Sequence, residues 1–563
     1  MRLTKCLFFT LLLCVFSLVF SLKQSYAQSV YAPLNRDYYH LLERYEIKYG
    51  RFAEGFHSHI RPFERKGIAQ LADSVAQDHN FLTSRDRFNI NYLRNDNWEW
   101  TDSATNDSRK PVLGIFYQKK SDLYQYRSDD FEVHVNPVLY LGAGVASDEE
   151  ATPYINTRGV ELRGMISKKI GFYTFLAENQ AVFPEYVRER ISFFNAVPNE
   201  GYFKPFKQNG VDFLTARGYI TFNIVKPIQV QFGHDRNFIG NGYRSMILSD
   251  YSNSHLFLKL NTRVWKINYQ NIFAQMNADI PTFADAVFPK KYFAFHHLSV
   301  NLTRNLNIGI FEAVMFGRGD STQRNGFDLN YLNPIIFFRS VEQQIGSEDN
   351  ALLGMDFKWN FLRHFSVYGQ LMLDEFLLSE IRGGNGWWAN KQAGQIGFKY
   401  IDVAGIPNLD LQAEANIARP YTYSHETPYT SYAHYNQPLA HPLGANFYEL
   451  IGIMRYQPIN RLQLTGKLIY AEYGGDSPGT NWGGNIRLPY QTRVQEYGNE
   501  IGQGIKTYLA FADLTASYQF KHNLFLDVKQ IARRANTSLP VKQNTLFTSL
   551  ALRWNIPQRM YEF

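Results

Sequence analysis

Cysteine is nearly absent from this chain of 563 residues: the sequence holds two, Cys6 and Cys14, and both lie in its first 27 residues. Charged residues make up 19% of the chain, less than the roughly 25% of an ordinary soluble domain. After the N-terminal apolar stretch, no apolar run approaches the roughly 20 residues that a membrane-spanning helix needs. If the first 27 residues are removed, disulfides and cysteine-ligated metals are excluded. A chain of this kind crosses a membrane only as a closed β-barrel.

The start of the chain has the order of a secretory signal peptide. Arg2 and Lys5 form a basic beginning, an apolar stretch runs from Leu7 to Leu22, and Ser25-Tyr26-Ala27 is a small-x-small cleavage site. We therefore expect residues 1–27 to be removed near Ala27 and the rest to be exported. The whole chain carries 58 Lys and Arg against 51 Asp and Glu, an excess too small to indicate a nucleic-acid partner.

Apolar and polar residues alternate with a period of two through most of residues 111–563. Clear examples are Phe131–Leu141, Leu409–Ile417 and Leu462–Tyr470. Such segments run for about 10–15 residues, longer than the usual globular strand of about 5–6, and suit a tilted membrane crossing. Abundant aromatics, 16% of the chain, exclude disorder and can supply interfacial girdles.

Turn lengths favour a membrane barrel over a soluble sandwich. Short turns, such as those at 303–305 and 362–364, join strands in pairs, and long stretches lie between the pairs at 184–213, 319–347, 419–445 and 473–504. Short turns at one end and long loops at the other are typical of outer-membrane barrels. The sequence therefore predicts an all-β, transmembrane antiparallel β-barrel.

Counting strands gives nineteen, from near Val112 to near Ile556, but a bacterial single-chain barrel normally has an even number. We predict 18 strands and regard 112–127 as the miscounted segment. The chain finishes in Tyr561-Glu562-Phe563, which resembles the end signal of outer-membrane barrel proteins. We expect both termini on the periplasmic side.

In residues 28–110 apolar and polar residues do not alternate, and their spacing predicts three short amphipathic helices. Asn35 and Ser84 can cap the first and third helices, and Pro62 suits the first position of the second. These helices form either a separate bundle or a plug at the periplasmic mouth. A wide barrel leaves a water-filled lumen unless something fills it, which favours the plug.

Motifs of catalysis are missing: the chain has no G-x-S-x-G elbow, no H-E-x-x-H and no P-loop. His234-Asp235 and Asp374-Glu375 are interpreted as polar residues of a barrel rather than acid–base pairs. Five histidines have no spacing typical of metal ligands: His296, His297, His364, His434 and His441. We expect no enzymatic activity, no metal and no cofactor.

A glycine-rich stretch follows the strand that ends near residue 235. Its marked residues are Gly240, Asn241, Gly242, Tyr243, Arg244 and Asp250. Two glycines permit positive φ, so a tight extracellular turn, with Arg244 and Asp250 paired across it, explains the stretch without a ligand. We favour this structural role over a binding role.

Several stretches resemble the capsule assembly Wzi family of outer-membrane proteins. They are Gly240–Asp250, the hairpin formed by Leu256–Leu260 and Trp265–Phe273, Arg61-Pro62-Phe63 and Asn136-Pro137. The resemblance implies an N-terminal helical bundle followed by an 18-stranded barrel, and a non-enzymatic lectin that helps attach or assemble surface polysaccharide. Related proteins of this type also occur with surface motility machinery. No sugar-binding residue of the family is carried over.

Aromatic residues in the long loops are the candidate ligand-binding residues: Trp387, Trp388, Tyr429, Tyr432, Tyr435 and Trp482. Flat rings match the apolar C–H face of a sugar at low entropy cost. The alternative is that they belong to the outer girdle or fold the loops together, which weighs most for Trp387 and Trp388.

Three functions stay open at this point. The first is binding of surface polysaccharide by a barrel surrounded by outer-membrane lipid, with no nucleic acid involved. The second is a channel, favoured by the polar residues Asp410, Gln412, Glu414 and Asn416. The third is a part in an adhesion, motility or secretion-associated surface assembly. A plugged lumen would argue against the channel.

Overall fold

A computed structural model describes most of the chain after the expected signal peptide, which lies outside the described residues. The described residues are 29–77, 82–101, 106–148, 151–278, 288–317, 326–337, 349–539 and 542–563. Most of the long stretch expected at 319–347 also falls outside them.

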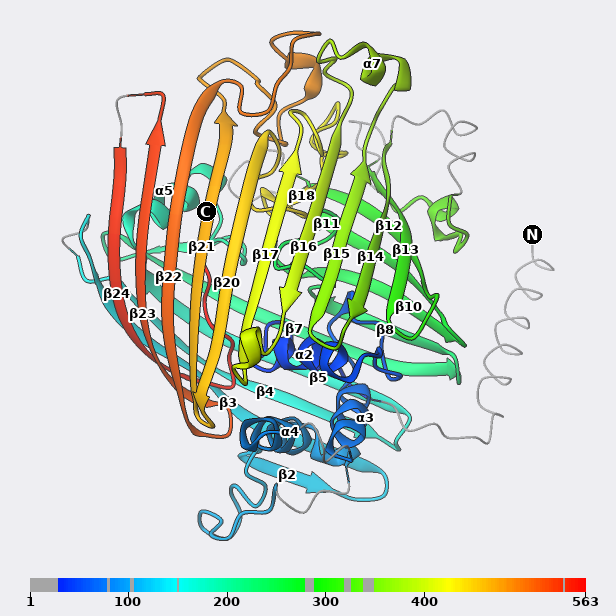
Figure 1. The fold of residues 1–563 in the computed structure, drawn as a ribbon, viewed down its shortest axis with the longest axis vertical. Helices are drawn as coiled ribbons and strands as arrows, with labels where there is room; N and C mark the ends of the chain where they lie inside the picture. The colour runs from blue at the N-terminus through cyan, green and yellow to red at the C-terminus, as the bar shows by residue number, and fades with distance from the viewer. Residues whose placement is uncertain are drawn as a thin grey trace, which may run out of the picture.

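Eighteen antiparallel strands of the described chain form a closed barrel, in which the last strand pairs with the first (Figure 1). This confirms the predicted fold class and strand number. In chain order they are β3 (Phe131–Ala146), β4 (Tyr154–Ile166), β5 (Ile170–Val182), β7 (Gly210–Val225), β8 (Ile228–Asp235), β10 (His255–Val264), β11 (Ile267–Asn277), β12 (Lys290–Asn301), β13 (Leu306–Phe316), β14 (Asn350–Phe361), β15 (Phe365–Leu373), β16 (Gln392–Tyr400), β17 (Leu409–Ala418), β20 (Phe447–Ile459), β21 (Leu462–Gly475), β22 (Ile505–Lys521), β23 (Leu524–Thr537) and β24 (Lys542–Trp554).

The miscounted segment at 112–127 lies outside the ring. Its only strand, β2 (Tyr124–Arg127), pairs with the beginning of β3 and with no strand on its other side. Short strands elsewhere also add to the barrel or pair apart from it: β1 (Ile60–Arg61) with β9 (Phe238–Ile239), β6 (Lys204–Phe206) with β7, and β18 (Ala433–His434) with β19 (Gln437–Pro438).

The barrel wall is inverted relative to a soluble protein, with apolar side chains outside and polar ones inside. On β17, Leu411 and Ile417 are 41% and 37% exposed, whereas Gln412, Glu414 and Asn416 are buried. Alternation along the strand separates the two faces. An outward apolar band around a polar interior is the arrangement of a barrel that faces lipid.

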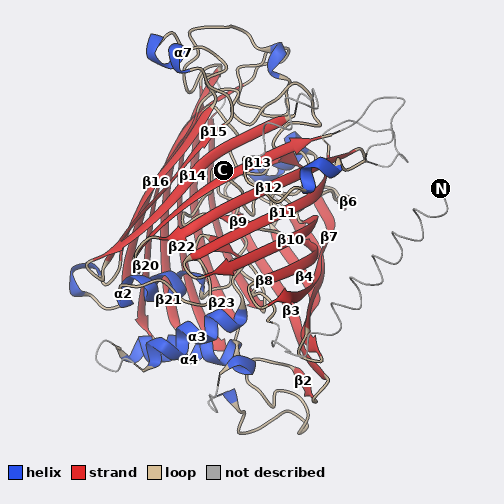
Figure 2. Ribbon diagram, turned by 90° about the vertical axis from the view of Figure 1, so that its right-hand side faces the viewer, coloured by secondary structure: helices blue, strands red, loops and turns tan. Residues whose placement is uncertain are grey.

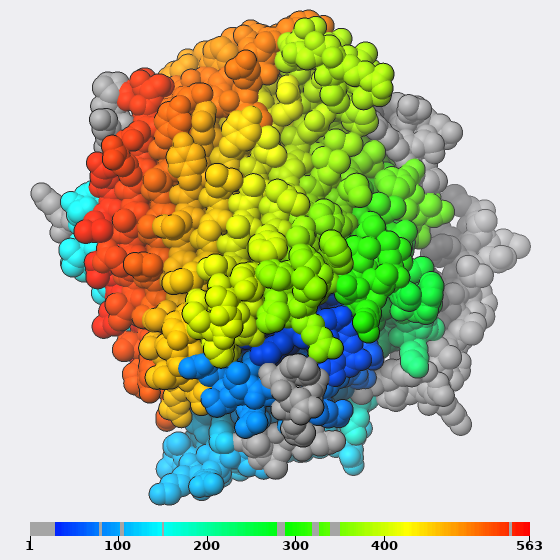
Figure 3. All heavy atoms as spheres, in the orientation of Figure 1, coloured from blue at the N-terminus to red at the C-terminus, as the bar shows by residue number. Residues whose placement is uncertain are grey.

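The two ends of the barrel differ. At one end, here called the short-turn end, strands are joined by turns such as those at 226–227 and 522–523; at the other, the long-loop end, lie extended segments such as 374–391 and 476–504. The helices at the short-turn end are α2 (Tyr39–Tyr49), α3 (Arg65–Ala76) and α4 (Ser84–Asp96) (Figure 2). In the long loops lie α5 (Glu185–Phe194) and α7 (Leu378–Gly383). Figure 3 shows the blue helical segment at one rim of the wall and the orange loops at the opposite rim.

The N-terminal helices begin close to their expected positions but use other caps. Tyr38 precedes α2, Glu64 precedes α3, and Thr83 caps α4 through a capping box with Asp86. Asn35 is therefore not the cap of the first helix, and the third cap is one residue earlier than Ser84. Among the described residues, no helix is both long and apolar enough to cross a membrane.

Candidate functional site

The interior of the barrel holds three segments that are distant in the sequence. They are the N-terminal segment (residues 29–110), the inward loop (residues 236–254) and the C-terminal tail (residues 555–563). Parts of each segment enter the lumen, whereas α3 and α4 lie at the short-turn end, so the geometry of the interior depends on how each segment is held.

Buried ion pairs hold the N-terminal segment against the barrel wall. Lys358 Nζ on β14 lies 2.8 Å from Glu46 Oε2 on α2, and the two side chains are 1% and 0% exposed. On β24, both terminal nitrogens of Arg553 donate to the Asp37 carboxylate at 2.6 Å. Paired charges tolerate burial where single ones do not.

Two carboxylates of the segment have lowered pKa values in this setting. Burial alone would raise the pKa of Glu43, but Lys399 and Arg61 hold it at about 2. The same opposition acts on Asp96, where burial raises the pKa but Arg65, His522 and Arg36 together keep it well below its ordinary value. Charge pairing thus favours the docked position of the segment.

The inward loop is not the extracellular turn that its glycines suggested. It leaves the wall at the long-loop end but folds into the lumen, where Gly240 N donates to the His59 carbonyl at 2.7 Å. The backbone N–H groups of Tyr243 and Arg244 donate to the Glu414 carboxylate at 2.7 and 3.0 Å. The loop therefore links the N-terminal segment to β17.

Close approach to the wall, together with a positive φ of 142° at Gly240, accounts for these two glycines. A Cβ atom at Gly240 would lie 2.5 Å from Gln370 Nε2, and one at Gly242 would lie 2.5 Å from Gln395 Oε1. Lys399 Nζ donates to the carbonyl between them, that of Asn241, at 2.8 Å. These glycines therefore have a structural role, as expected, but inside the lumen and not in an extracellular turn.

The expected pairing of Arg244 with Asp250 is wrong. Arg244 Nη2 instead lies 3.3 Å from Glu449 Oε1 and donates to the Glu562 carbonyl at 2.8 Å. Asp250 accepts a hydrogen bond from Asn35 of the N-terminal segment. The two residues therefore connect the inward loop to different neighbours.

The C-terminal tail turns back from β24 and runs through the lumen toward the long-loop end (Figure 1). Phe563 is 5% exposed and packs against Tyr186 and Val187 of α5, and Glu562 pairs with Lys467 on β21. The expectation that this end lies on the periplasmic side is wrong, because Phe563 completes an apolar cluster inside the barrel.

A cavity of about 290 Å³ remains where the three segments meet. Its wall is rich in charged side chains, among them Arg36, Arg217, Arg236, Arg455, Glu161 and Arg559. Pockets for small ligands usually measure about 300–1,000 Å³, so this space is at the small end of that range and is too small for a polymer.

Two of the predicted tryptophans lie in an aromatic cluster at the long-loop end, here called the loop cluster (Trp387, Trp388, Tyr490). The Trp388 and Tyr490 rings are 4.7 Å apart, and the Arg493 guanidinium lies 4.2 Å from the centre of the Trp388 ring. Both tryptophans are half-buried, so part of each ring stays accessible.

The third tryptophan, Trp482, is half-buried in the adjacent loop. That loop is tied to the region of the loop cluster through Tyr421, whose N–H donates to the Gly483 carbonyl at 3.0 Å and whose hydroxyl donates to the Asn481 carbonyl at 2.9 Å. Tyr421 also lies edge-on to Trp388 at 6.3 Å.

The predicted tyrosines lie apart from the loop cluster. Tyr432 is 1% exposed, stacks on Tyr423 at 5.7 Å and donates to the Ile247 carbonyl at 2.8 Å, so it serves packing rather than ligand contact. Tyr435 lies edge-on to Tyr202 at 4.8 Å, and Tyr429 is half-buried. The sequence favoured the mid-loop tyrosines over Trp387 and Trp388 as ligand contacts. The burial of Tyr432 argues against that preference for this residue.

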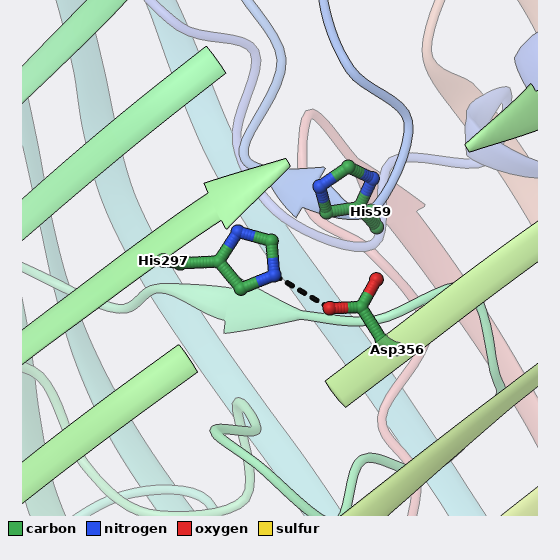
Figure 4. A group of neighbouring side chains, drawn as sticks. All are labelled: His59, His297 and Asp356. Carbon is green, nitrogen blue, oxygen red and sulfur yellow. Dashed lines mark hydrogen bonds and ion pairs between the residues drawn. The ribbon is translucent and has the colours of Figure 1, made fainter. Parts of the chain in front are cut away.

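Sequence spacing missed one group of side chains. His297, which seemed isolated, meets His59 and Asp356 inside the barrel (Figure 4). The three lie on β12, on the segment before β1 and on β14, and no local motif connects such distant positions. Only the inward-facing pattern of β12 and β14 marks two of them as lumen residues.

Comparison with known proteins gives one family and several solved structures. The family model of the capsule assembly protein Wzi matches residues 112–549. The chain is similar to the solved structure of Wzi from Escherichia coli, described as an outer-membrane protein involved in group 1 capsule assembly and a carbohydrate-binding β-barrel. Identity is 14%, with 94% of this chain and 100% of that chain covered and a TM-score of 0.55.

Weaker structural similarity extends to two proteins of Pseudomonas aeruginosa. OprD is 11% identical, with 75% of this chain and 94% of that chain covered and a TM-score of 0.41. OpdQ is 9% identical, with 76% and 99% covered and a TM-score of 0.40. The search of curated proteins found no match.

Proposed function

The chain belongs to the capsule assembly Wzi family, and we propose that it binds surface polysaccharide without turning it over, and so assists the attachment or assembly of capsule or exopolysaccharide. The family and the barrel fold indicate the outer membrane. Surface polysaccharide is then the partner on the outer side, and lipid surrounds the wall.

The loop cluster is the observation that carries this proposal. It offers half-buried aromatic rings at the long-loop end, and the Arg493 guanidinium covers one face of the Trp388 ring. A sugar stacks its C–H face on such a ring and places its hydroxyls or acidic groups beside the polar neighbours. Rings fixed by their packing lose little conformational freedom when a ligand binds.

The filled lumen supports binding at the loops over transport through the barrel. The N-terminal segment, the inward loop and the C-terminal tail leave a cavity of about 290 Å³, which does not suit the passage of a polymer. A channel function would require at least the N-terminal segment to leave the lumen, against several buried ion pairs.

Cells that lack the native protein and produce variants test the proposal. Replacing both Trp387 and Trp388 by Ala should increase the polysaccharide that is shed and decrease the polysaccharide that stays on cells. The matched control is Trp265→Ala, because Trp265 is 82% exposed in a turn at the short-turn end. Heat-modifiable gel migration verifies that every variant forms its barrel.

Two outcomes separate the parts of the proposal. If the folded double variant retains polysaccharide like the parent while the deletion strain sheds it, the family role stands and the loop cluster is not the binding site. If the deletion strain also retains its polysaccharide, the proposed function is wrong.

A further inference from the structure

Three buried side chains from separate parts of the chain converge inside the barrel. His59, His297 and Asp356 are 1%, 0% and 1% exposed, and their potential ligand atoms all lie within 4.8 Å of one another. Figure 4 shows the His59 ring beside the hydrogen-bonded pair of His297 and Asp356.

Each of the three carries a polar atom with no hydrogen-bond partner in the described part of the protein. These atoms are His59 Nε2, His297 Nδ1 and Asp356 Oδ1. One contact within the group is short, with His297 Nε2 at 2.5 Å from Asp356 Oδ2. Buried polar atoms are normally satisfied, so three unpartnered atoms in one cluster of ligating side chains point to a bound ligand.

A glycine keeps the space beside the cluster open. Gly309 lies on β13, between the strands that carry His297 and Asp356. A Cβ atom there would lie 2.5 Å from Asp356 Oδ2 and 2.7 Å from His297 Nε2. A side chain at this position would displace the ends of these two side chains.

We propose that His59, His297 and Asp356 form a binding site for a divalent transition-metal ion, with zinc as the best chemical match. Two imidazole nitrogens and one carboxylate oxygen form a ligand set that zinc favours, at about 2.0–2.2 Å. Tetrahedral geometry places such ligand atoms about 3.3 Å apart, so on binding the short contact between His297 and Asp356 would open and any longer separation within the 4.8 Å group would close.

Neighbouring charges permit a cation at this place. Lys358, two residues after Asp356 on the same face of β14, is paired with Glu46 at 2.8 Å. The next histidine, His57, is engaged with Ser299 at 2.8 Å. Because both neighbours already have partners, a water molecule is the simplest fourth ligand.

The site would connect the N-terminal segment to the barrel wall. His59 belongs to the segment, whereas His297 and Asp356 belong to β12 and β14. An ion that binds only the docked arrangement stabilises it by mass action. At free metal about 100 times the Kd, the docked state gains about 100-fold in population relative to the undocked state.

Metal content of the full-length protein is the direct test. Protein purified without a histidine tag and stripped with a chelator is given Zn²⁺ and then analysed by mass spectrometry of the metal. Bound Co²⁺, followed by its visible absorption, provides the ligand geometry. We expect one tightly bound ion per chain, and tetrahedral Co²⁺ spectra.

Variants establish which residues bind. His59→Gln and Asp356→Asn should lose the ion, whereas His57→Gln, a matched change two residues away, should retain it. Protease release of the N-terminal segment should slow on metal addition in the parent and in His57→Gln only.

The measurement that can overturn the proposal uses the parent protein and does not depend on whether any variant folds. If the stripped parent takes up no Zn²⁺ or Co²⁺ beyond what dialysis removes, the three residues are a metal-free hydrogen-bonded group. Uptake that persists unchanged in folded His59→Gln would equally refute this ligand set. Neither result depends on polysaccharide binding.

Discussion

Replacing Glu46 by glutamine should loosen the N-terminal segment from the barrel wall. The carboxylate is fully buried 2.8 Å from Lys358 Nζ, and glutamine would leave that ammonium with Ser58 Oγ, at 3.0 Å, as its other hydrogen-bond partner in the described protein. Breaking a buried pair by removing one charge costs about 3–5 kcal/mol, because the remaining charge is uncompensated. Since each 1.36 kcal/mol is a tenfold change, the docked population should fall relative to the undocked one by about two to three and a half orders of magnitude.

Two further variants make the argument specific. Adding Lys358→Met to Glu46→Gln removes both charges and should restore much of the lost docking. Glu496→Gln is the matched control: Glu496 pairs with Arg493, but its side chain is 53% exposed. An exposed pair contributes at most about 1 kcal/mol, so this change should have little effect on docking.

Single-channel recording in planar bilayers and limited proteolysis of the N-terminal segment measure the docked population. Glu46→Gln should open more often and be cleaved faster than the parent, and the double variant should fall between them. The reasoning is refuted if Glu46→Gln behaves like Glu496→Gln, or if the double variant is looser than the single one.

Removing residues 28–110 should turn a poorly conducting barrel into one with large, steady pores in planar bilayers, and equal conductance with and without the segment would favour the channel function. Acidification from pH about 4.3 to about 2 should loosen the same segment, because the pKa values of Glu43 and Asp96 are lowered in the folded protein and their stabilising charge is lost as the pH falls through them. Amide hydrogen exchange over α2 and α4 measures this loss, and unchanged protection at pH 2 would contradict it. Phe563→Ala should cost about 3–5 kcal/mol of stability, since the ring is almost fully buried, and would show as a lower temperature of heat-modifiable migration; an unchanged temperature argues against this packing role.

The barrel was predictable from sequence because its wall obeys a local rule. Alternation along β17 separates Leu411 from Gln412 without any knowledge of the neighbouring strands, and the same rule holds around the ring. Local patterns also predicted the three helices of the N-terminal segment. The number of 18 strands followed from requiring an even count. The segment that we excluded for this reason, 112–127, lies outside the ring.

The contents of the lumen were not predictable in the same way. Gly240 and Gly242 are compatible with an exposed turn and equally with a close approach to Gln370 and Gln395. The sequence alone therefore does not distinguish the two structures. Phe563 is apolar whether it faces lipid or the interior. Such choices depend on contacts between residues far apart in the chain, for which no local period exists.

The candidate sites include residues that a local pattern identifies and residues that only long-range contacts bring together. Aromatic residues with polar neighbours in long loops made Trp387 and Trp388 candidate ligand contacts, and the structure places both at the long-loop end, half-buried; their role in binding stays a prediction. Tyr432 has the same local signature but is buried by Tyr423 and the inward loop. His59 and His297 approach each other only because β1 pairs with β9 inside a closed barrel, which no spacing rule contains.

The interior contacts also determine when the protein can be complete. Asp37 and Arg553 are 516 residues apart in the chain, so the N-terminal segment cannot gain this partner until the last strand has arrived. Contacts of such long range form late and slowly. During that interval the apolar cluster of the segment packs on itself but lacks the cover of Phe238 and Phe525, and exposed apolar surface favours aggregation. Closure of β24 on β3 is the event after which the segment has all its partners in the wall.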